Sequence, residues 1–374
     1  MSNIDNDLLI HALSPIMQWL DDPEVTDIMI LGSRDIHARR RGSDFEPVPT
    51  SWQSDTDLFT TARTIGRQLS RKIDAREPML DSRLPDMSRV CVVVDPCYNR
   101  GACIIIRKFP GHHFTLEDLV GFGALDKTGM TILEAIMRLG RNILICGGTG
   151  SGKTTLLNSL CGFIPEGAVV VTVEDVREIS ISHRLWIPLE TKRAFDKEDH
   201  DVTLHDLIRT SLRMNPRWII VGEVRDKEAS VLARAFNTGH CGLGTIHANS
   251  AYDSLLALEN LIAQAENSGQ ARTAKEQVAR AIQIVIHMEE LPDHSRRLME
   301  IAEVQGLDYD RSANFPPYKL QTLYRYEFDH YDDAGKACGR FIVENTPSWI
   351  NRLRMIPGYQ MPSFWHQQKE IQHA

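Results

Sequence analysis

Residues 143–155 place a short apolar run directly before the glycine-rich motif G-x-x-x-x-G-K-T, which extends from Gly147 to Thr154. The glycines let the backbone turn tightly and direct successive N–H groups at an anion, and the positive end of the following helix adds to the attraction. The apolar run at 143–146 is typical of a buried strand, and leucines follow the motif at helical spacing. Strand, loop and helix together predict a phosphate-binding loop that takes ATP or GTP.

Each position of this loop has an expected part in nucleotide binding. Lys153 is expected to reach the β- and γ-phosphates, and the hydroxyl of Thr154 is expected to ligate Mg²⁺. A dinucleotide-binding loop of the form G-x-G-x-x-G is excluded, because Lys153 stands in the place of the third glycine. The residues expected to bind the nucleotide are Gly147, Gly148, Thr149, Gly150, Ser151, Gly152, Lys153, Thr154 and Thr155.

Composition narrows the class of protein. The chain has 374 residues, of which 42% are hydrophobic and 25% charged, as expected for two or three globular domains. With neither a bilayer-spanning apolar stretch nor a signal peptide, we expect a cytoplasmic protein that touches a membrane only through partners. Seven cysteines without a C-x-x-C pair indicate reduced thiols. The net charge of −8 argues against a broad nucleic-acid footprint, although Arg39, Arg40 and Arg41 form a local basic run.

The apolar pattern divides the chain into four parts. We expect a smaller α/β domain at 1–108, a linker at 109–125, a nucleotide-binding domain at 126–305 and a C-terminal segment at 306–374. The predicted strands are 25–31, 35–40, 90–94, 102–106, 143–146, 169–173, 218–222 and 243–246, and the predicted helices are 58–69, 204–212 and 251–287. Because strands and helices alternate in the third part, the predicted fold class is α/β with a parallel-containing central sheet.

Acidic residues follow two predicted strands of the nucleotide-binding domain. Glu174 and Asp175 come after the strand at 169–173, and Glu223 comes after the strand at 218–222. An NTPase needs carboxylates at such strand ends to hold Mg²⁺ through water and to polarise the attacking water. We expect Glu223 to be the second-strand carboxylate, Glu174 to activate or orient the water, and Asp175 to hold Mg²⁺ through water. Which carboxylate accepts the proton stays open.

A glycine-rich segment at 238–249 contains His240 and His247. One interpretation is a γ-phosphate sensor, in which an imidazole reports the nucleotide state to a moving loop. Zinc binding by His240, Cys241 and His247 is the competing interpretation, but the spacing matches no common structural zinc site. A core or surface role is the default for either histidine alone.

Arginines can stabilise the charge that develops on a transferred phosphoryl group, and a finger from a neighbouring subunit completes the site only in an assembly. Arg209 and Arg213 lie four residues apart on the helix side away from its leucines, where surface ion pairing is an alternative. Sequence alone does not select among the candidates Arg83, Arg89, Arg107, Arg209, Arg213 and Arg225.

Four stretches, in this order, resemble the secretion and pilus-assembly ATPases of type II and type IV systems. They are GGTGSGKTTLLN at 147–158, VTVEDVREI at 171–179, LRMNPRWIIVGEVRD at 212–226 and NTGHCGLGTIHANS at 237–250. Flanking stretches resemble the CpaF class of Flp (tad) pilus ATPases, namely DPEVTDIMI at 22–30, DSRLPDMSRV at 81–90, IIIRKF at 104–109 and RRLMEIAEVQGLD at 296–308.

The resemblance implies a hexameric ring, in which each subunit joins an N-terminal α/β domain to a RecA-like motor domain and ATP lies between the two. It implies an ATPase that powers pilus assembly or secretion through an inner-membrane platform protein, peripheral to the membrane. It also implies residue roles: phosphate and Mg²⁺ binding by Lys153 and Thr154, an acidic box at Glu174, a catalytic carboxylate at Glu223, a histidine box at His247 beside His240, and phosphate contacts by Arg107, with Arg89 and Arg209 as further candidates.

Departures from the family pattern leave the subclass open. The four-cysteine zinc module of many type II secretion ATPases is absent, and Asp226 after GEVR is more typical of pilus motors. Conjugation and type IV secretion ATPases therefore stay alternatives to pilus assembly. A RecA-like helicase is a further hypothesis, but the net charge of −8 gives little support for its basic, aromatic-lined track. A nucleotide-binding scaffold with a silent site is disfavoured by Lys153, Glu174 and Glu223 occurring together.

Overall fold

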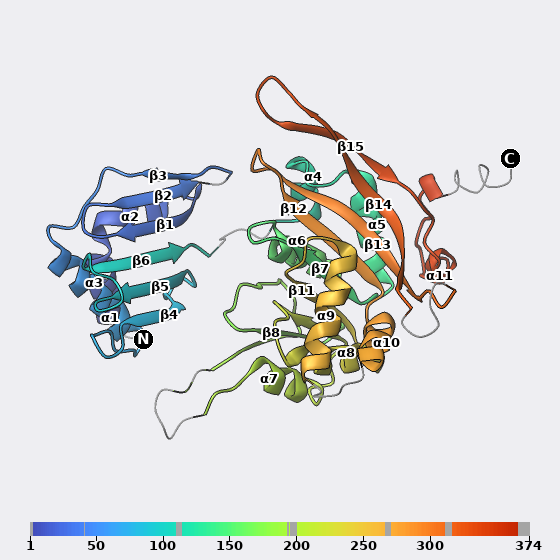
Figure 1. Ribbon diagram of the computed structural model, residues 1–374, viewed down its shortest axis with the longest axis horizontal. Helices are drawn as coiled ribbons and strands as arrows, with labels where there is room; N and C mark the ends of the chain where they lie inside the picture. Colours follow the sequence, from blue (N-terminus) through green and yellow to red (C-terminus); the bar gives the residue numbers. More distant parts are fainter. Residues whose placement is uncertain are drawn as a thin grey trace. The chain divides into compact units, whose positions relative to one another are not determined.

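The computed structural model describes residues 3–40, 42–109, 114–192, 194, 200–265, 271–310 and 316–365. The chain forms two compact units, Met1–His112 and His113–Ala374 (Figure 1). Arg41 of the basic run and the linker signal at 110–113 lie outside the described residues. No helix in the described ranges is both long enough and apolar enough to cross a membrane.

The described part of the first unit is an antiparallel sheet with helices on one face. Its strands are β1 (Val25–Leu31), β2 (Ile36–Arg40), β3 (Phe45–Pro47), β4 (Met79–Arg83), β5 (Arg89–Val94) and β6 (Ala102–Arg107), in the order β3-β2-β1-β6-β5-β4. Its helices are α1 (Asn3–Ala12), the 3₁₀ turn η1 (Ser14–Ile16), α2 (Met17–Asp21) and α3 (Asp55–Gln68). The hairpin predicted over residues 32–34 and the strands at 90–94 and 102–106 are confirmed.

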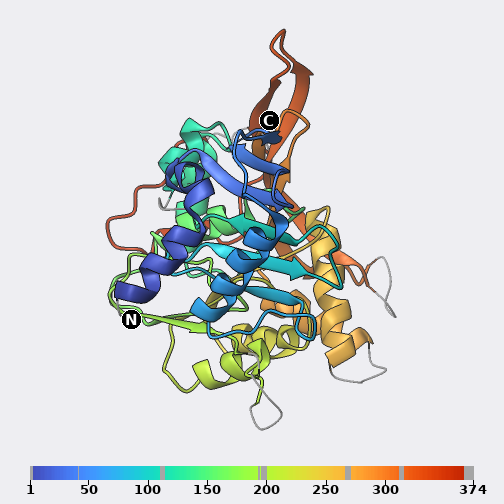
Figure 2. The same cartoon turned by 90° about the vertical axis from the view of Figure 1, so that its left-hand side faces the viewer.

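The helix α3 shows how the sequence builds this unit. It begins after Ser54, whose hydroxyl accepts the N–H of Asp57 as an N-cap. Its buried side chains, including Leu58 and Ile65, pack in one core with alternate residues of the strands, such as Ile104. Helices therefore cover one face of the sheet (Figure 2), and the opposite face carries the half-exposed side chains of β1, β5 and β6.

The described part of the second unit is built on a larger, mixed sheet. Its strands are β7 (Ile143–Gly147), β8 (Val170–Glu174), β9 (Trp186–Glu190), β10 (Trp218–Val221), β11 (Cys241–Ile246), β12 (Ile284–Glu290), β13 (Arg296–Leu307), β14 (Tyr318–Tyr331) and β15 (Ala337–Val343). They lie in the order β15-β14-β13-β12-β7-β11-β10-β8-β9. The pairs from β12 to β9 are parallel, and the pairs joining β12, β13, β14 and β15 are antiparallel.

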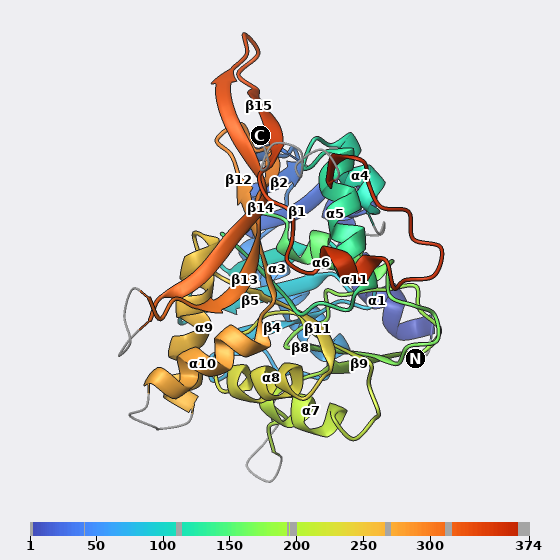
Figure 3. The same cartoon turned by 90° about the vertical axis from the view of Figure 1, so that its right-hand side faces the viewer.

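Helices cover both faces of this sheet (Figure 3). They are α4 (Leu116–Gly121), α5 (Lys127–Arg138), α6 (Lys153–Cys161), α7 (Leu204–Ser211), α8 (Glu228–Asn237), α9 (Ala251–Ala265), α10 (Ala271–Ala281) and α11 (Ile350–Leu353). Ile143 and Ile145 of β7 pack in one core with α4, α5 and α6, whereas Leu144 and Cys146 pack in a second core with α7, α8, α9 and α10. Burial on both faces explains the continuous apolar runs of these strands.

The structure differs from the sequence predictions in three places. The predicted helix over 251–287 is wrong at its end, because residues from Ile284 onward form the buried strand β12 beside β7. The C-terminal segment expected at 306–374 supplies β14 and β15 to the same sheet as the nucleotide-binding strands. The linker expected at 109–125 contains α4, which begins at the capping box of Thr115. The helix predicted over 204–212 is α7, and the hydroxyl of Thr203 caps it by accepting the N–H of Asp206.

The parallel strands bring their carboxyl ends to one edge of the sheet. The register aligns Ile246 of β11 with Cys146 of β7, and Val221 of β10 with Gly244 of β11 and Val173 of β8. The loops that follow these strands are therefore neighbours, although they are far apart in the sequence. Ligand sites of parallel sheets form at this edge.

We predict that Gly242→Ala destabilises the second unit while Gly244→Ala, two residues along β11, does not. A Cβ at Gly242 would lie 2.4 Å from the carbonyl oxygen of Ile219, whereas a Cβ at Gly244 would make only ordinary contacts from 3.5 Å outward. We expect a loss of about 1–3 kcal/mol for the first variant and less than about 0.5 kcal/mol for the second. Urea unfolding followed by tryptophan fluorescence measures both; equal losses would contradict the packing described here.

Candidate active site

The loop between β7 and α6 has the backbone that the glycine motif predicts. Gly147, Gly150 and Gly152 adopt positive φ angles of 153°, 81° and 93°. A Cβ at Gly147 would lie 2.2 Å from the carbonyl oxygen of Met288, so no side chain fits there. The helix α6 begins at Lys153 immediately after Gly152, and its N-terminal N–H groups follow the loop.

Lys153 is held against the loop backbone. Its side chain is buried, and Nζ donates to the carbonyl oxygens of Gly147 at 3.0 Å and Gly148 at 2.7 Å. Burial lowers the pKa of Lys153, while the negative charge of Glu223 opposes that shift. The lysine at the start of α6 and the carboxylate of Glu223 after β10 therefore belong to one electrostatic site.

Glu174, the last residue of β8, is an almost fully buried carboxylate, with 3% of the residue exposed. Its Oε1 accepts the backbone N–H groups of Glu178 and Ile179, both at 2.8 Å. Its Oε2 is buried and has no hydrogen-bond partner among the residues that the structure describes. Burial raises the pKa of Glu174 to about 7, against the lowering effect of the two N–H donors. A carboxyl group with such a pKa exchanges protons near neutral pH.

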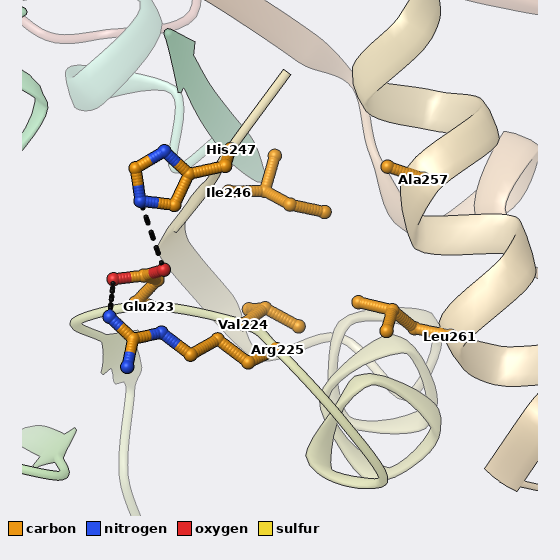
Figure 4. A pocket seen from close by; sticks show the side chains of 7 residues that line it. All are labelled: Glu223, Val224, Arg225, Ile246, His247, Ala257 and Leu261. Atoms are coloured by element: carbon orange, nitrogen blue, oxygen red, sulfur yellow. Dashed lines mark hydrogen bonds and ion pairs between the residues drawn. The ribbon is translucent and has the colours of Figure 1, made fainter. Parts of the chain in front are cut away.

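Glu223, which follows β10, lies between two basic side chains (Figure 4). Its Oε2 accepts from Arg225 at 2.5 Å, and its Oε1 lies 3.2 Å from Nε2 of His247, which follows β11. The hydrogen bond to Glu223 raises the pKa of Arg225. Both partners are half-exposed, so this cluster stays accessible to a ligand.

A shallow cavity of about 430 Å³ lies beside this cluster. Its charged side is formed by Glu223, Arg225 and His247, and its apolar side includes Ala257 and Leu261 of α9, which face the cluster across the cavity (Figure 4). The structure thus brings the predicted residues Lys153, Glu174, Glu223 and His247 to the carboxyl ends of the neighbouring strands β7, β8, β10 and β11.

The donor atoms at this edge fit a magnesium ion. Mg²⁺ prefers oxygen ligands and is usually held by one or two protein groups together with phosphate oxygens and water. Thr154 supplies a hydroxyl in the first turn of α6, and Asp175 supplies an exposed carboxylate directly after Glu174. The buried, unpartnered Oε2 of Glu174 offers a further acceptor for a water at the site.

His240 lies at the opposite edge of the sheet. It directly precedes β11, whereas His247 follows β11, so the whole strand separates the two histidines. Nδ1 of His240 contacts the carbonyl oxygen of Ala235 at 3.0 Å and the hydroxyl of Thr238. The structure therefore does not bring His240 to the phosphate loop, and a shared zinc ion with His247 is ruled out by the length of β11.

Arg209 and Arg213 are exposed at the end of α7, on the side away from its buried residues, Leu204 and Ile208. The structure places neither of them among the residues around Glu223 or Glu174. Both remain predictions for contacts made outside this chain.

Arg83, Arg89 and Arg107 form a cross-strand row in the first unit. Arg83 of β4 pairs in register with Arg89 of β5, and Arg89 pairs with Arg107 of β6. On the far side of Arg107 the row continues to Asp27, which also faces Arg39. Like charges directly opposite each other destabilise a sheet.

Two carboxylates accompany this arginine row. Asp27 is buried and accepts from Arg39 at 2.7 Å and from Arg107 at 3.0 Å, and Asp81 pairs with Arg89 at 2.8 Å. Burial alone would raise the pKa of Asp27, but the hydrogen bonds from Arg39 and Arg107 lower it below its ordinary value. Arg107 keeps about half of its side chain exposed, at 54%.

Sequence reasoning missed one residue at the loop. Arg296, the first residue of β13, donates from Nε to the carbonyl oxygen of Gly150 at 2.6 Å. Arg296 opens the stretch RRLMEIAEVQGLD, but the pairing of β12 with β7 that brings it to the loop was not visible in the sequence.

The chain is similar to known proteins in sequence and in fold. The family described as "Type II/IV secretion system protein" matches residues 11–316. An uncharacterized protein of Methanocaldococcus jannaschii is 33% identical over 228 residues, which are 61% of this chain and 41% of that protein. The conjugal transfer protein TrbB of Rhizobium radiobacter is 28% identical over 291 residues, 77% of this chain and 86% of that protein. The first of these relatives is thus matched over less than half of its length.

The solved structures include a similar fold. The crystal structure of the pilus retraction motor PilT with bound ADP has a TM-score of 0.55 and 22% sequence identity, and it covers 84% of this chain and 82% of that chain. This likeness confirms the predicted α/β fold class.

We predict that Glu174→Gln removes a pH-dependent loss of stability. Because the pKa of Glu174 is raised from 4.5 to about 7, the folded protein keeps a proton that the unfolded chain releases between these pH values. The free energy of unfolding therefore falls as the pH rises through this window, by at most ~3 kcal/mol for this group. The variant lacks that fall, so its stability relative to wild type increases from about pH 5 to about pH 7 and then stays constant.

Urea unfolding at several pH values, for wild type and variant, measures this difference. Glu166→Gln is the control for the loss of one carboxylate, since Glu166 is exposed in the loop after α6. A parallel pH dependence of wild type and Glu174→Gln would contradict the raised pKa.

Proposed function

The chain belongs to the family of type II/IV secretion system proteins, and on this premise we propose that it is an ATPase that uses ATP hydrolysis to move a pilus or secretion substrate. The observation that carries the proposal is the edge of the second sheet, where a phosphate loop, two carboxylates and a histidine follow four neighbouring strands. A non-enzymatic scaffold would not require a buried carboxylate with a pKa of about 7 beside the loop.

In the proposed reaction, the loop amides and Lys153 bind the phosphates of ATP. Thr154 and Asp175 would hold Mg²⁺, Asp175 through water, and the ion would neutralise charge on the phosphates. Glu223 lies between Arg225 and His247, and it polarises the attacking water. The unpartnered Oε2 of Glu174 accepts a hydrogen bond from that water and orients it. His247 reports the state of the γ-phosphate through Glu223.

The first unit supplies charge to the same reaction in this proposal. Arg107 and Arg89, in the arginine row of the open sheet face, are the residues of this unit that we propose for phosphate contacts. The exposed fraction of Arg107 and the excess of arginines over carboxylates in the row support an anionic ligand. The exposed Arg209 of α7, and Arg213 shortly after α7, are the candidates for contacts with a nucleotide in a neighbouring copy.

We propose further that the working form is a homohexamer that acts at the cytoplasmic side of the inner membrane. There it would transmit force to a platform protein of a pilus or secretion machine. The similar proteins named for conjugal transfer and for pilus retraction support this setting, since both names describe transport machines. The net charge of −8 gives a nucleic-acid track no support.

We predict that two substitutions separate nucleotide binding from hydrolysis. Lys153→Ala removes the buried ammonium at the loop and should weaken ATP binding at least tenfold. Glu223→Gln keeps the loop intact and should lower kcat about 100-fold or more, while ATP affinity changes less than about threefold. Phosphate release and a fluorescent nucleotide titration measure the two effects.

Glu166→Gln serves as the matched control for the loss of one carboxylate, and it should hydrolyse ATP at the wild-type rate. Unchanged turnover of Lys153→Ala would refute the assignment of the phosphate site. Unchanged turnover of Glu223→Gln would refute its role in polarising water.

We also predict the assembly of a ring. Six copies of the 42.4 kDa chain have a mass of about 254 kDa. Light scattering with a non-hydrolysable ATP analogue should report this mass. A persistent monomer at high protein concentration, with and without the analogue, would contradict the ring while leaving the nucleotide site untouched.

A further inference from the structure

The hairpin of β12 and β13 packs directly on the phosphate loop. A Cβ at Gly147 would meet the carbonyl oxygen of Met288, and a Cβ at Gly152 would lie 3.3 Å from Cδ of Arg296. A Cβ at Gly150 would lie 2.8 Å from a carboxylate oxygen of Glu290. Three glycines of the loop thus face the same hairpin, which touches the loop on the side of β12.

The turn of this hairpin is fixed by its own hydrogen bonds. Asp293 accepts the N–H and the hydroxyl of Ser295 through one oxygen, and the N–H of Ala337 in β15 through the other, at 2.8 Å. The N–H of Leu291 donates to the carbonyl oxygen of Ser295. The segment that leads into Arg296 is therefore fixed by hydrogen bonds within its own turn and by one hydrogen bond to the hairpin of β14 and β15.

Arg296 presents its guanidinium to one peptide unit of the loop. Nε donates to the carbonyl oxygen of Gly150 at 2.6 Å, and a terminal nitrogen lies 4.0 Å from Glu290. The carbonyl of Gly150 and the N–H of Ser151 belong to the same peptide unit. A charged donor on the carbonyl polarises that unit and makes its N–H a stronger donor.

The N–H of Ser151 retains capacity for a ligand. Its bond to the carbonyl oxygen of Gly148 is long, at 3.4 Å, and phosphate loops bind anions through such amides. The hydroxyl of Ser151 is engaged with Gly148 at 2.9 Å, so the amide is the group of Ser151 that is left for a phosphate.

We propose that Arg296 is a positioning residue of the nucleotide site, which fixes and polarises the Gly150–Ser151 peptide from outside the loop so that the Ser151 amide is presented to the phosphates. This inference rests on the proposed function. It gives β13 a role in nucleotide affinity. β13 lies outside the family-like stretches at 147–158, 171–179 and 237–250. Arg296 acts through the loop backbone, so it should affect binding more than the chemical step.

The test compares three variants of the full chain with ADP that carries a fluorescent N-methylanthraniloyl group. Arg296→Met keeps the aliphatic stem beside Gly152 but removes the donor, and it should weaken ADP binding about tenfold. Arg296→Lys restores a cationic donor and should recover affinity to within about threefold of wild type. Arg297→Met is the matched control, because Arg297 donates to Ala337 and lies over the ring of Tyr326 instead of contacting the loop.

Steady-state kinetics gives a readout that a purely structural role would not produce. In Arg296→Met, KM for ATP should rise about tenfold together with the Kd for ADP, while kcat stays within about threefold of wild type. Wild-type ADP affinity in Arg296→Met, or an equal loss in Arg297→Met, would overturn the inference and leave the proposed function standing. Failure of the wild-type chain to bind ADP would overturn both.

Discussion

The parallel pairing of β7, β11, β10 and β8 is the constraint on which the candidate site depends. Parallel strands end at the same edge of a sheet, so the loops that follow them become neighbours without any contact in the sequence. The register aligns Cys146 with Ile246 and Val221 with Val173, which sets the loop, the histidine and both carboxylates side by side. Apolar side chains on both faces hold this register, because a shift would expose part of two separate cores.

The electrostatics of the site follow from that placement. Glu174 is buried because it lies at the end of β8, inside the sheet. An ionised carboxylate there accepts from only two backbone donors, although it has four lone pairs. Ionisation therefore costs free energy, and this cost raises the pKa of Glu174. Glu223 lies one strand nearer the loop and contacts Arg225 and His247. The two glutamates therefore differ in environment, because one is enclosed by the sheet and the other is paired with basic side chains at its surface.

Much of the fold was predictable, and the parts that were not share a physical reason. The phosphate loop, the strands leading to Glu174 and Glu223, and the N-caps of Thr115 and Thr203 are local patterns, and the structure has them. The run from Ile284 was assigned to a helix, because a short apolar segment buried on both faces has no period to distinguish strand from helix. The contact of Arg296 with Gly150 and the distance of His240 from the loop depend on strand order, which a single sequence does not encode locally.

The arginine row of the first unit is not explained by stability alone. Arg89 lies in register between Arg83 and Arg107, so positive charges face one another across two strand pairs, an arrangement that costs free energy in an isolated sheet. Asp27 and Asp81 compensate part of that charge, but Asp27 is shared between Arg39 and Arg107. Replacing Arg107 by a neutral residue would remove one of the two arginines that hold the buried carboxylate of Asp27, although the sheet core on the other face would be unchanged. The row therefore serves the fold through Asp27 and still leaves more arginines than carboxylates on a half-exposed face, which is the charge that our proposal uses for an anionic ligand.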